Sequence, residues 1–114
     1  MVYYTRIFDS KTQQQIGNMV DITTQGIMLV SSEPVPVQTN FQLKLELSDD
    51  IADKPFLELE TRSVWCHHDI DPNYYNSGFQ ILSPTSEDMD IIQRIIEAYG
   101  IRDNLLNSYK EKGQ

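Results

Sequence analysis

The sequence has little cysteine, little positive charge and no long apolar run. Its single cysteine, Cys66, cannot form an internal disulfide, so we expect a reducing, cytoplasmic compartment. No apolar run approaches the roughly 20 residues of a transmembrane helix. The N-terminal stretch 1–10 lacks a basic segment followed by an apolar one, so it does not resemble a signal peptide. These absences predict a chain that does not insert into a membrane.

The shortage of basic residues also limits the partners. Nine Lys and Arg residues stand against 17 Asp and Glu residues, which leaves a formal charge of −8. Such a field repels phosphate backbones and anionic lipids, so we expect no nucleic-acid partner. The acidity is uneven, because residues 1–40 hold two cations and three anions, a net −1, and residues 41–114 hold the remaining −7. An anionic ligand is therefore tolerated best in the first third of the chain.

The first two-thirds of the chain has the pattern of β-strands. The clearest example is the segment 41–47, where Phe and Leu alternate with polar residues as in a half-buried strand. On the segment 56–67, alternation places Trp65 on the same face as Leu57 and Leu59. The six strands are expected at residues 3–8, 15–22, 27–30, 41–47, 56–67 and 75–82.

A helix is predicted over residues 85–99. Thr85 to Asp88 fits the [ST]-x-x-[DE] pattern of a helix start, and Gly100 is a suitable C-cap. The apolar stripe at helical spacing consists of Met89, Ile92, Ile95, Ile96 and Tyr99. We therefore expect an all-β fold with a C-terminal helix over residues 1–100, a six-stranded antiparallel Greek-key-like β-barrel plus one amphipathic α-helix. Residues 101–114 are predicted to form a helical extension or a frayed tail.

The residues that could support catalysis are poorly arranged. Cys66, His67 and His68 are consecutive, and neighbouring side chains on a strand point to opposite faces. A nucleophile needs an adjacent base, which this spacing does not supply. The segment Asp69–Asn73 begins like a calcium loop, but Tyr74 stands where the loop requires glycine and Gln80 where it requires glutamate. We therefore predict no enzyme activity, no bound metal and no cofactor.

One loop has the composition of a binding site. Asp21, Thr23 and Gly26 form the pattern D-x-T-x-x-G between two predicted strands. An aspartate and a threonine can fix a turn through backbone amides, and a glycine allows a flat ligand to approach the backbone. Two interpretations stay open, a plain turn and a rigid polar rim for a ligand.

The wider pattern resembles the PilZ domain, a bacterial receptor module for cyclic di-GMP. Residues 17–47, GNMVDITTQGIMLVSSEPVPVQTNFQLKLEL, are similar to its strand, D-x-S-x-x-G loop, apolar strand and proline-bearing connection, with Thr23 in place of Ser. Val64-Trp65 and residues 75–81 resemble its later strand pair. The resemblance covers about residues 3–99 and implies a six-stranded barrel with a C-terminal helix.

The resemblance implies that cyclic di-GMP binds at Asp21, Thr23 and Gly26. Two arginines of an R-x-x-x-R arm clamp the phosphates in the family, but no such motif precedes Asp21 here. Arg6 and Arg62 are the candidates within this chain for the missing positive charge, and a partner chain is the other possible source of arginines. The function implied is a non-catalytic receptor or adaptor that signals through a protein partner or a homo-oligomer.

The second hypothesis is a degenerate PilZ domain that does not bind cyclic di-GMP and acts as a protein-interaction adaptor. Tyrosine is favoured at interfaces, and four tyrosines would suit that role if exposed. They are Tyr3, Tyr4, Tyr74 and Tyr75, for which ordinary barrel packing is the alternative.

Overall fold

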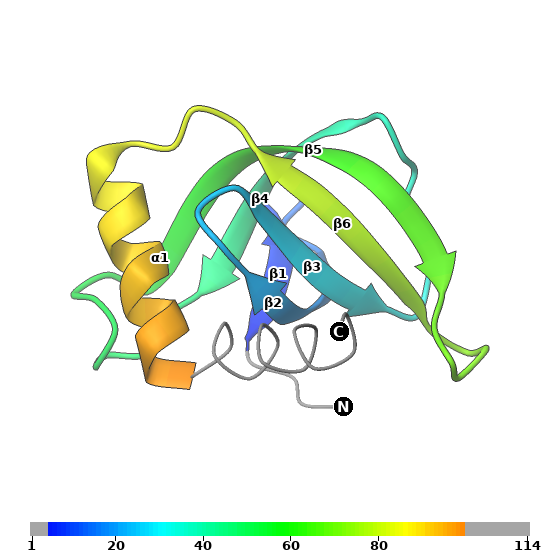
Figure 1. Ribbon diagram of the computed structural model, residues 1–114, viewed down its shortest axis with the longest axis horizontal. Coiled ribbons are helices and arrows are strands. Elements are labelled where there is room, and N and C mark those ends of the chain that lie inside the picture. The colour runs from blue at the N-terminus through cyan, green and yellow to red at the C-terminus, as the bar shows by residue number, and fades with distance from the viewer. Residues whose placement is uncertain (1–4, 100–114) are drawn as a thin grey trace, which may run out of the picture.

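Six antiparallel strands close into a barrel in the computed structural model, which describes residues 5–99 (Figure 1). They are β1 (Arg6–Asp9), β2 (Gln15–Ile22), β3 (Gly26–Ser31), β4 (Asn40–Glu46), β5 (Phe56–His68) and β6 (Tyr75–Ile81). Around the barrel the order is β1-β2-β3-β6-β5-β4, so β3 lies beside β6 and the first and fourth strands complete the closure. The predicted six-stranded barrel is confirmed, while Tyr3 and Tyr4 lie outside the described residues.

The barrel interior is filled by the apolar parity of each strand. On β4, Leu43 and Leu45 are fully buried, whereas Lys44 points outward, with its Nζ 4.2 Å from the ring centre of Phe56. Ile7 on β1 and Leu29 on β3 are also fully buried. One face of each strand is apolar and the other is polar. Closing the sheet into a barrel buries all the apolar faces in one core.

The alternation on β5 is interrupted, and the prediction for Trp65 is wrong for that reason. The register between β5 and β6 shifts between Ser63 and Trp65, so Val64 is an extra residue. A bulge of this kind turns the following side chains to the opposite face. Trp65 therefore lies outside the barrel, directly opposite Gly78, instead of in the core with Leu59.

Helix α1 (Ser86–Tyr99) lies at one end of the barrel, beside the start of β5 (Figure 1). Its start is the predicted capping box, because Asp88 N donates to Thr85 Oγ1 at 3.0 Å and Thr85 N donates to Asp88 Oδ2 at 2.9 Å. Within residues 5–99 no helix is long and apolar enough to cross a membrane. Gly100 and the segment 101–114 lie outside the described residues.

The apolar stripe of α1 is shifted from its predicted position. Met89 is 40% exposed, while Ile91, which is not part of the predicted stripe, is buried. The other buried residues are Ile92, Ile95 and Ile96. At 3.6 residues per turn, Met89 lies roughly 90° around the helix from the centre of this face. It therefore projects past the barrel instead of into it.

The connection between β3 and β4 is held against β5 by one serine. Ser63 Oγ donates to Pro36 O at 2.7 Å and accepts the N–H of Thr39 at 3.1 Å. Backbone bonds from Gln38 N to Ser63 O and from Ser63 N to Thr39 O add to this attachment. The connection thus runs along the edge of β5, just before the bulge that sets the direction of Trp65.

Two fully buried serines provide a stability prediction. Ser63 holds the connection, whereas Ser77 Oγ has no hydrogen-bond partner among residues 5–99. We expect Ser63→Ala to destabilise the protein by about 1–3 kcal/mol, because buried backbone groups lose their partner. Ser77→Ala should change stability by less than about 0.5 kcal/mol or increase it, because it removes an unsatisfied hydroxyl. Urea unfolding of both variants checks this, and equal losses would contradict it.

Candidate functional site

The loop between β2 and β3 is a rigid turn built on Thr23. The N–H of Thr23 donates to Gly26 O at 2.8 Å. In return, Thr23 Oγ1 accepts the N–H of Gln25 at 3.1 Å and that of Gly26 at 3.2 Å. The hydroxyl therefore holds the loop closed, as the simpler interpretation of D-x-T-x-x-G requires. A rigid loop is also what a preformed binding rim needs.

This loop forms one side of an open depression of about 340 Å³ on the outer face of β3, β6 and β5. Three of the five predicted site residues, Asp21, Thr23 and Gly26, lie together around it. The complete lining is Asp21, Thr23, Gly26, Ile27, Met28, Val64, Trp65, Gly78, Phe79 and Gln80. The structure therefore joins the loop to strands that lie some 40 to 60 residues further along the chain.

The strand register explains how these residues come together. Gly26 pairs with Gln80, and Met28 pairs with Gly78. Gly78 in turn pairs with Trp65. A Cβ on Gly26 would lie 2.9 Å from Phe79 O, so this position has no room for a larger residue. Gly78 likewise has no room for a side chain, because the indole of Trp65 lies over it.

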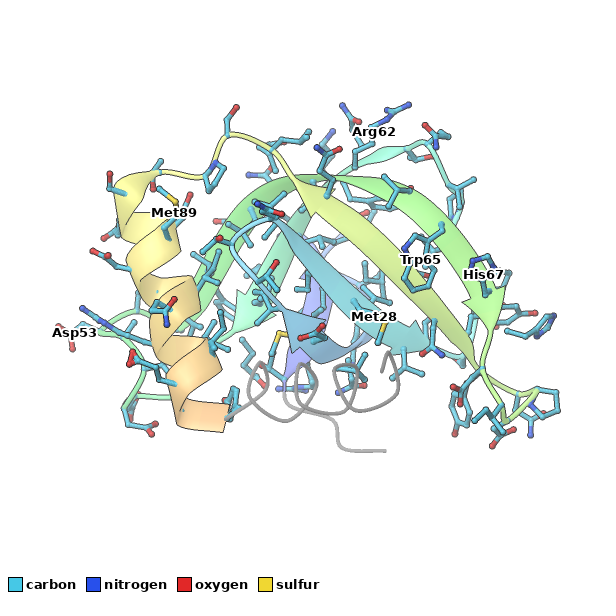
Figure 2. The ribbon with its side chains drawn as sticks, viewed as in Figure 1. Met28, Asp53, Arg62, Trp65, His67 and Met89 are labelled. Carbon is cyan, nitrogen blue, oxygen red and sulfur yellow. The ribbon has the colours of Figure 1, made fainter. Side chains whose placement is uncertain are left out.

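Trp65 is the site residue that the sequence analysis missed. Strict alternation assigned it to the core, whereas the structure places it over β6 with Met28 on the far side of that strand (Figure 2). One sequence signal could have suggested this. That signal is Gly78 on the sixth predicted strand, because an aromatic residue on a neighbouring strand can cover a strand glycine.

Arg62 lies near the depression without lining it. It pairs with Gln80 on one side and with Asn40 on the other, so it is in the same cross-strand row as Gly26. With strands spaced 4.7–4.9 Å apart, two strand spacings put it about 10 Å from Gly26. Arg62 Nη1 donates to Asn40 Oδ1 at 2.9 Å and Nη2 donates to Gln38 Oε1 at 3.3 Å. Both of these partners are uncharged, so neither hydrogen bond neutralises the positive charge of Arg62.

Arg6 lies elsewhere and already has an anionic partner. It is on β1, two strands from β3, and its Nε and Nη2 both donate to the Glu46 carboxylate on β4, with Nε 3.0 Å from Oε1. These hydrogen bonds raise the pKa of Arg6 and hold the pKa of Glu46 below its usual value, although slight burial opposes the effect on Glu46. Arg6 and Arg62 are equivalent candidates in the sequence. In the structure they lie on different strands, and Arg6 is paired with a carboxylate whereas Arg62 donates to two amide oxygens.

The candidate catalytic cluster is separated into different environments. Cys66 faces inward, where its Sγ accepts the N–H of Val35 at 3.5 Å. His67 stacks on Trp65 outside the barrel, and His68 contacts the ring of Tyr75 at 4.6 Å between ring centres. No cysteine–histidine pair forms among these residues. The consecutive residues are therefore parts of a strand, as expected from their alternation.

The calcium-like segment is a hydrogen-bonded turn. Asp71 Oδ1 accepts the N–H of Asn73 at 3.0 Å, and Asp71 O accepts that of Tyr74 at 3.0 Å. Asp69 Oδ1 accepts a hydrogen bond from Asn76 Nδ2 at 2.8 Å, which lowers the pKa of Asp69. In the described part of the chain, no three His, Cys, Asp or Glu side chains come close enough to hold a metal ion. The carboxylates here stabilise the β5–β6 turn.

A larger hollow of about 420 Å³ lies over β2 and the end of β3, and it contains none of the predicted site residues. Its lining is uncharged and consists of Gln15, Ile16, Gly17, Asn18, Val30, Ser31, Ser32 and Tyr74. Size alone would favour this hollow. The smaller depression has the more varied chemistry, with a carboxylate, a hydroxyl and an indole around one space.

Comparison with known proteins agrees with this architecture. No curated protein sequence matches the chain. Among solved structures, the Bacillus subtilis inhibitor of motility MotI/DgrA is similar in fold, with a TM-score of 0.62 at 15% sequence identity. The match covers 87% of this chain and 47% of that chain, so this chain spans about half the length of that protein. The family model of the PilZ domain matches residues 3–98, nearly the whole chain. On that match, together with the barrel and its terminal helix, the chain belongs to the PilZ domain family.

Proposed function

We propose that this protein is a non-catalytic receptor module for cyclic di-GMP that signals through a partner protein. The observation that carries the proposal is the depression beside the β2–β3 loop, where Asp21, Thr23 and Gly26 meet the outer faces of β5 and β6. PilZ domains are generally non-catalytic binding modules. The side chains of Cys66, His67 and His68 contact different residues and form no cysteine–histidine pair, which fits that role. The single cysteine also supports a cytoplasmic location.

The depression suits a guanine at one end of the ligand. Guanine presents N–H donors on one edge, and the Asp21 carboxylate is an acceptor at the rim. Gly26 permits close approach to the backbone. Thr23 keeps the loop in place through its two accepted hydrogen bonds, so its expected contribution is to hold the rim closed.

Arg62 is the cation we propose for a phosphate of the ligand. Cyclic di-GMP carries two negative charges, and the chain around it has a net charge of −8. The Arg62 guanidinium, which donates to the amide oxygens of Asn40 and Gln38, can exchange either of them for a phosphate oxygen. Charge-assisted bonds to phosphate are worth about 1.5–3 kcal/mol. Arg6 would first have to break its hydrogen bonds to Glu46, and it lies on β1, which contributes no residue to the depression.

Arg62→Ala is expected to weaken cyclic di-GMP binding about tenfold or more, since each 1.4 kcal/mol is tenfold in affinity. Arg6→Ala is the matched control and should leave the affinity within about twofold. Asp21→Ala should also weaken binding. Calorimetric titration at low salt measures all three, with far-ultraviolet circular dichroism to confirm folding. No saturable heat from the wild-type protein would reject the receptor function. Equal losses for the two arginine variants would reject the role of Arg62.

The alternative function, an interaction adaptor without nucleotide, is favoured by the exposed tip of the β5–β6 hairpin. Ile70 is fully exposed there and Tyr74 is 38% exposed. Tyr75 is half-buried and packs against His68. Chemical crosslinking in the native host separates this function from the first. A defined partner crosslinked to wild-type protein, lost in Ile70→Asp and unaffected by cyclic di-GMP, would favour the adaptor.

A further inference from the structure

The hollow over β2 and the end of β3 lies where these two strands stop pairing. Their last pair is Asn18 with Val30, whereas β2 begins three residues before Asn18 and β3 ends one residue after Val30. A bulge lies at the same place, because the register between β1 and β2 shifts and leaves Ile16 as an extra residue. Bulges are frequent at barrel rims and beside functional sites, where they redirect side chains. The hollow, of about 420 Å³, is therefore a product of the strand pairing.

The lining of this hollow is uncharged, which is unusual for this chain. Charged residues make up 23% of the sequence, and carboxylates line three other hollows on the described residues. An ionised ligand here would lose part of its hydration without gaining a charged partner, which costs free energy. The hollow therefore suits a ligand that carries no net charge.

Amide and hydroxyl groups supply the hydrogen-bonding capacity of the hollow. Gln15 and Asn18 each have an amide oxygen that accepts and an amide nitrogen that donates, and the Ser32 hydroxyl does both. The bonds that Gln15 already makes are long, with its Nε2 3.4 Å from both Gly17 O and Asn18 Oδ1. A ligand can therefore replace them at small cost. This lining matches a partner whose own groups both donate and accept, as hydroxyl groups do.

Tyr74 adds an apolar surface to the hollow. It is the last residue before β6 begins, and it is 38% exposed. A tyrosine ring presents an apolar face together with a polar hydroxyl. A sugar ring is complementary to such a surface, because its C–H groups form an apolar face and its hydroxyl groups project from the edge. The size is also suitable, since pockets for small molecules have volumes of about 300–1,000 Å³.

We propose that this hollow binds a neutral sugar ring. The amides of Gln15 and Asn18 bind its hydroxyl groups, and the ring of Tyr74 packs against its C–H face. The site shares no lining residue with the depression beside the β2–β3 loop, so it is separate from the proposed nucleotide function. Because no charge takes part, the affinity should be independent of ionic strength. We expect a dissociation constant on the order of 1–10 mM, since one ring in an open hollow buries little surface.

Nuclear magnetic resonance of isotope-labelled protein tests the proposal, with glucose, galactose and mannose as the probes. We expect at least one of these hexoses to shift the side-chain amide signals of Gln15 and Asn18 saturably, with equal affinity at low and high salt. Glucuronate and glucosamine are the charged counterparts, and they should bind about fivefold or more weakly than the best hexose. Glycerol, which has hydroxyl groups but no ring, should cause no saturable shift.

Four variants locate the site. Gln15→Ala and Tyr74→Leu should each weaken hexose binding about fivefold or more, because one removes hydrogen bonds and the other an aromatic face. Tyr74→Phe keeps that face and should stay within about twofold. Gln14→Ala is the matched control, since Gln14 is exposed, precedes Gln15 in the chain and does not line the hollow. Circular dichroism confirms that each variant is folded.

The outcomes that would overturn the proposal are distinct. No saturable shift from any of the three hexoses, at concentrations up to about ten times the expected dissociation constant, would reject the site. Equal losses for Gln14→Ala and Gln15→Ala would reject its location. Tighter binding of glucuronate or glucosamine than of every hexose, or an affinity that falls with salt, would reject the neutral class of ligand. Hexose binding that persists in Asp21→Ala would support a site separate from the nucleotide depression.

Discussion

Replacing Gly17 with alanine is expected to destabilise the barrel by about 3 kcal/mol or more, at or above the upper end of the usual cost of overpacking. Gly17 is buried on β2, where β3 passes unusually close. A Cβ at this position would lie 2.4 Å from Val30 O and 2.9 Å from Leu29 Cδ1. The first of these atoms belongs to the backbone, so no rotamer change relieves the clash. The two strands must separate, and their hydrogen bonds weaken as a result.

The measurement is equilibrium urea unfolding followed by circular dichroism. Gln15→Ala is the matched control, because Gln15 lies on the same strand and is exposed. Surface substitutions of that kind usually change stability by less than about 0.5 kcal/mol. A Gly17→Ala variant as stable as the control would contradict the close approach of β2 and β3.

Replacing Ile92 with alanine is the second change with a large expected effect, a loss of about 2–5 kcal/mol. Ile92 is fully buried in the core cluster that α1 shares with the barrel strands, together with Leu47, Ile51 and Leu57. Truncation would leave a cavity between the helix and the barrel end, because neither the strands nor the helix can move closer without breaking other contacts. We therefore expect α1 to be part of the cooperative unit of the fold.

Met89→Ala is the control for this prediction, since Met89 is on the same helix but faces outward. It removes a side chain of comparable size and should cost less than about 0.5 kcal/mol. Thermal and urea unfolding of both variants provide the comparison. Similar small losses for the two would show that the helix end of the barrel folds independently of α1.

Much of the fold follows from local rules that act along the chain. The alternation on residues 41–47 correctly predicts which side chains of β4 are buried, and the capping box of Thr85 and Asp88 correctly predicts where α1 begins. Both signals are strong because each depends on neighbours within four residues. The helix stripe was less exact, since the choice between Met89 and Ile91 depends on where the barrel ends.

The candidate site was only partly predictable. Asp21, Thr23 and Gly26 line one depression because they occupy one short loop, and their role in ligand binding stays a prediction. The sequence pattern did not separate Arg6 from Arg62, since only the pairing of strands decides that one faces Glu46 and the other Asn40. Nor did it predict that Trp65 faces outward, because one extra residue in a strand turns every later side chain to the opposite face.

The sequence by itself thus determined the six strands, the terminal helix and the polar loop Asp21–Gly26, since periodicity and turn chemistry are local properties. The tertiary structure alone decided what surrounds that loop. Register between β3, β6 and β5 brings Gly78, Gln80 and Trp65 to it, and the bulge at Val64 turns the indole outward. Register and bulges are set by packing across strands distant in sequence, which is why no local pattern reveals them.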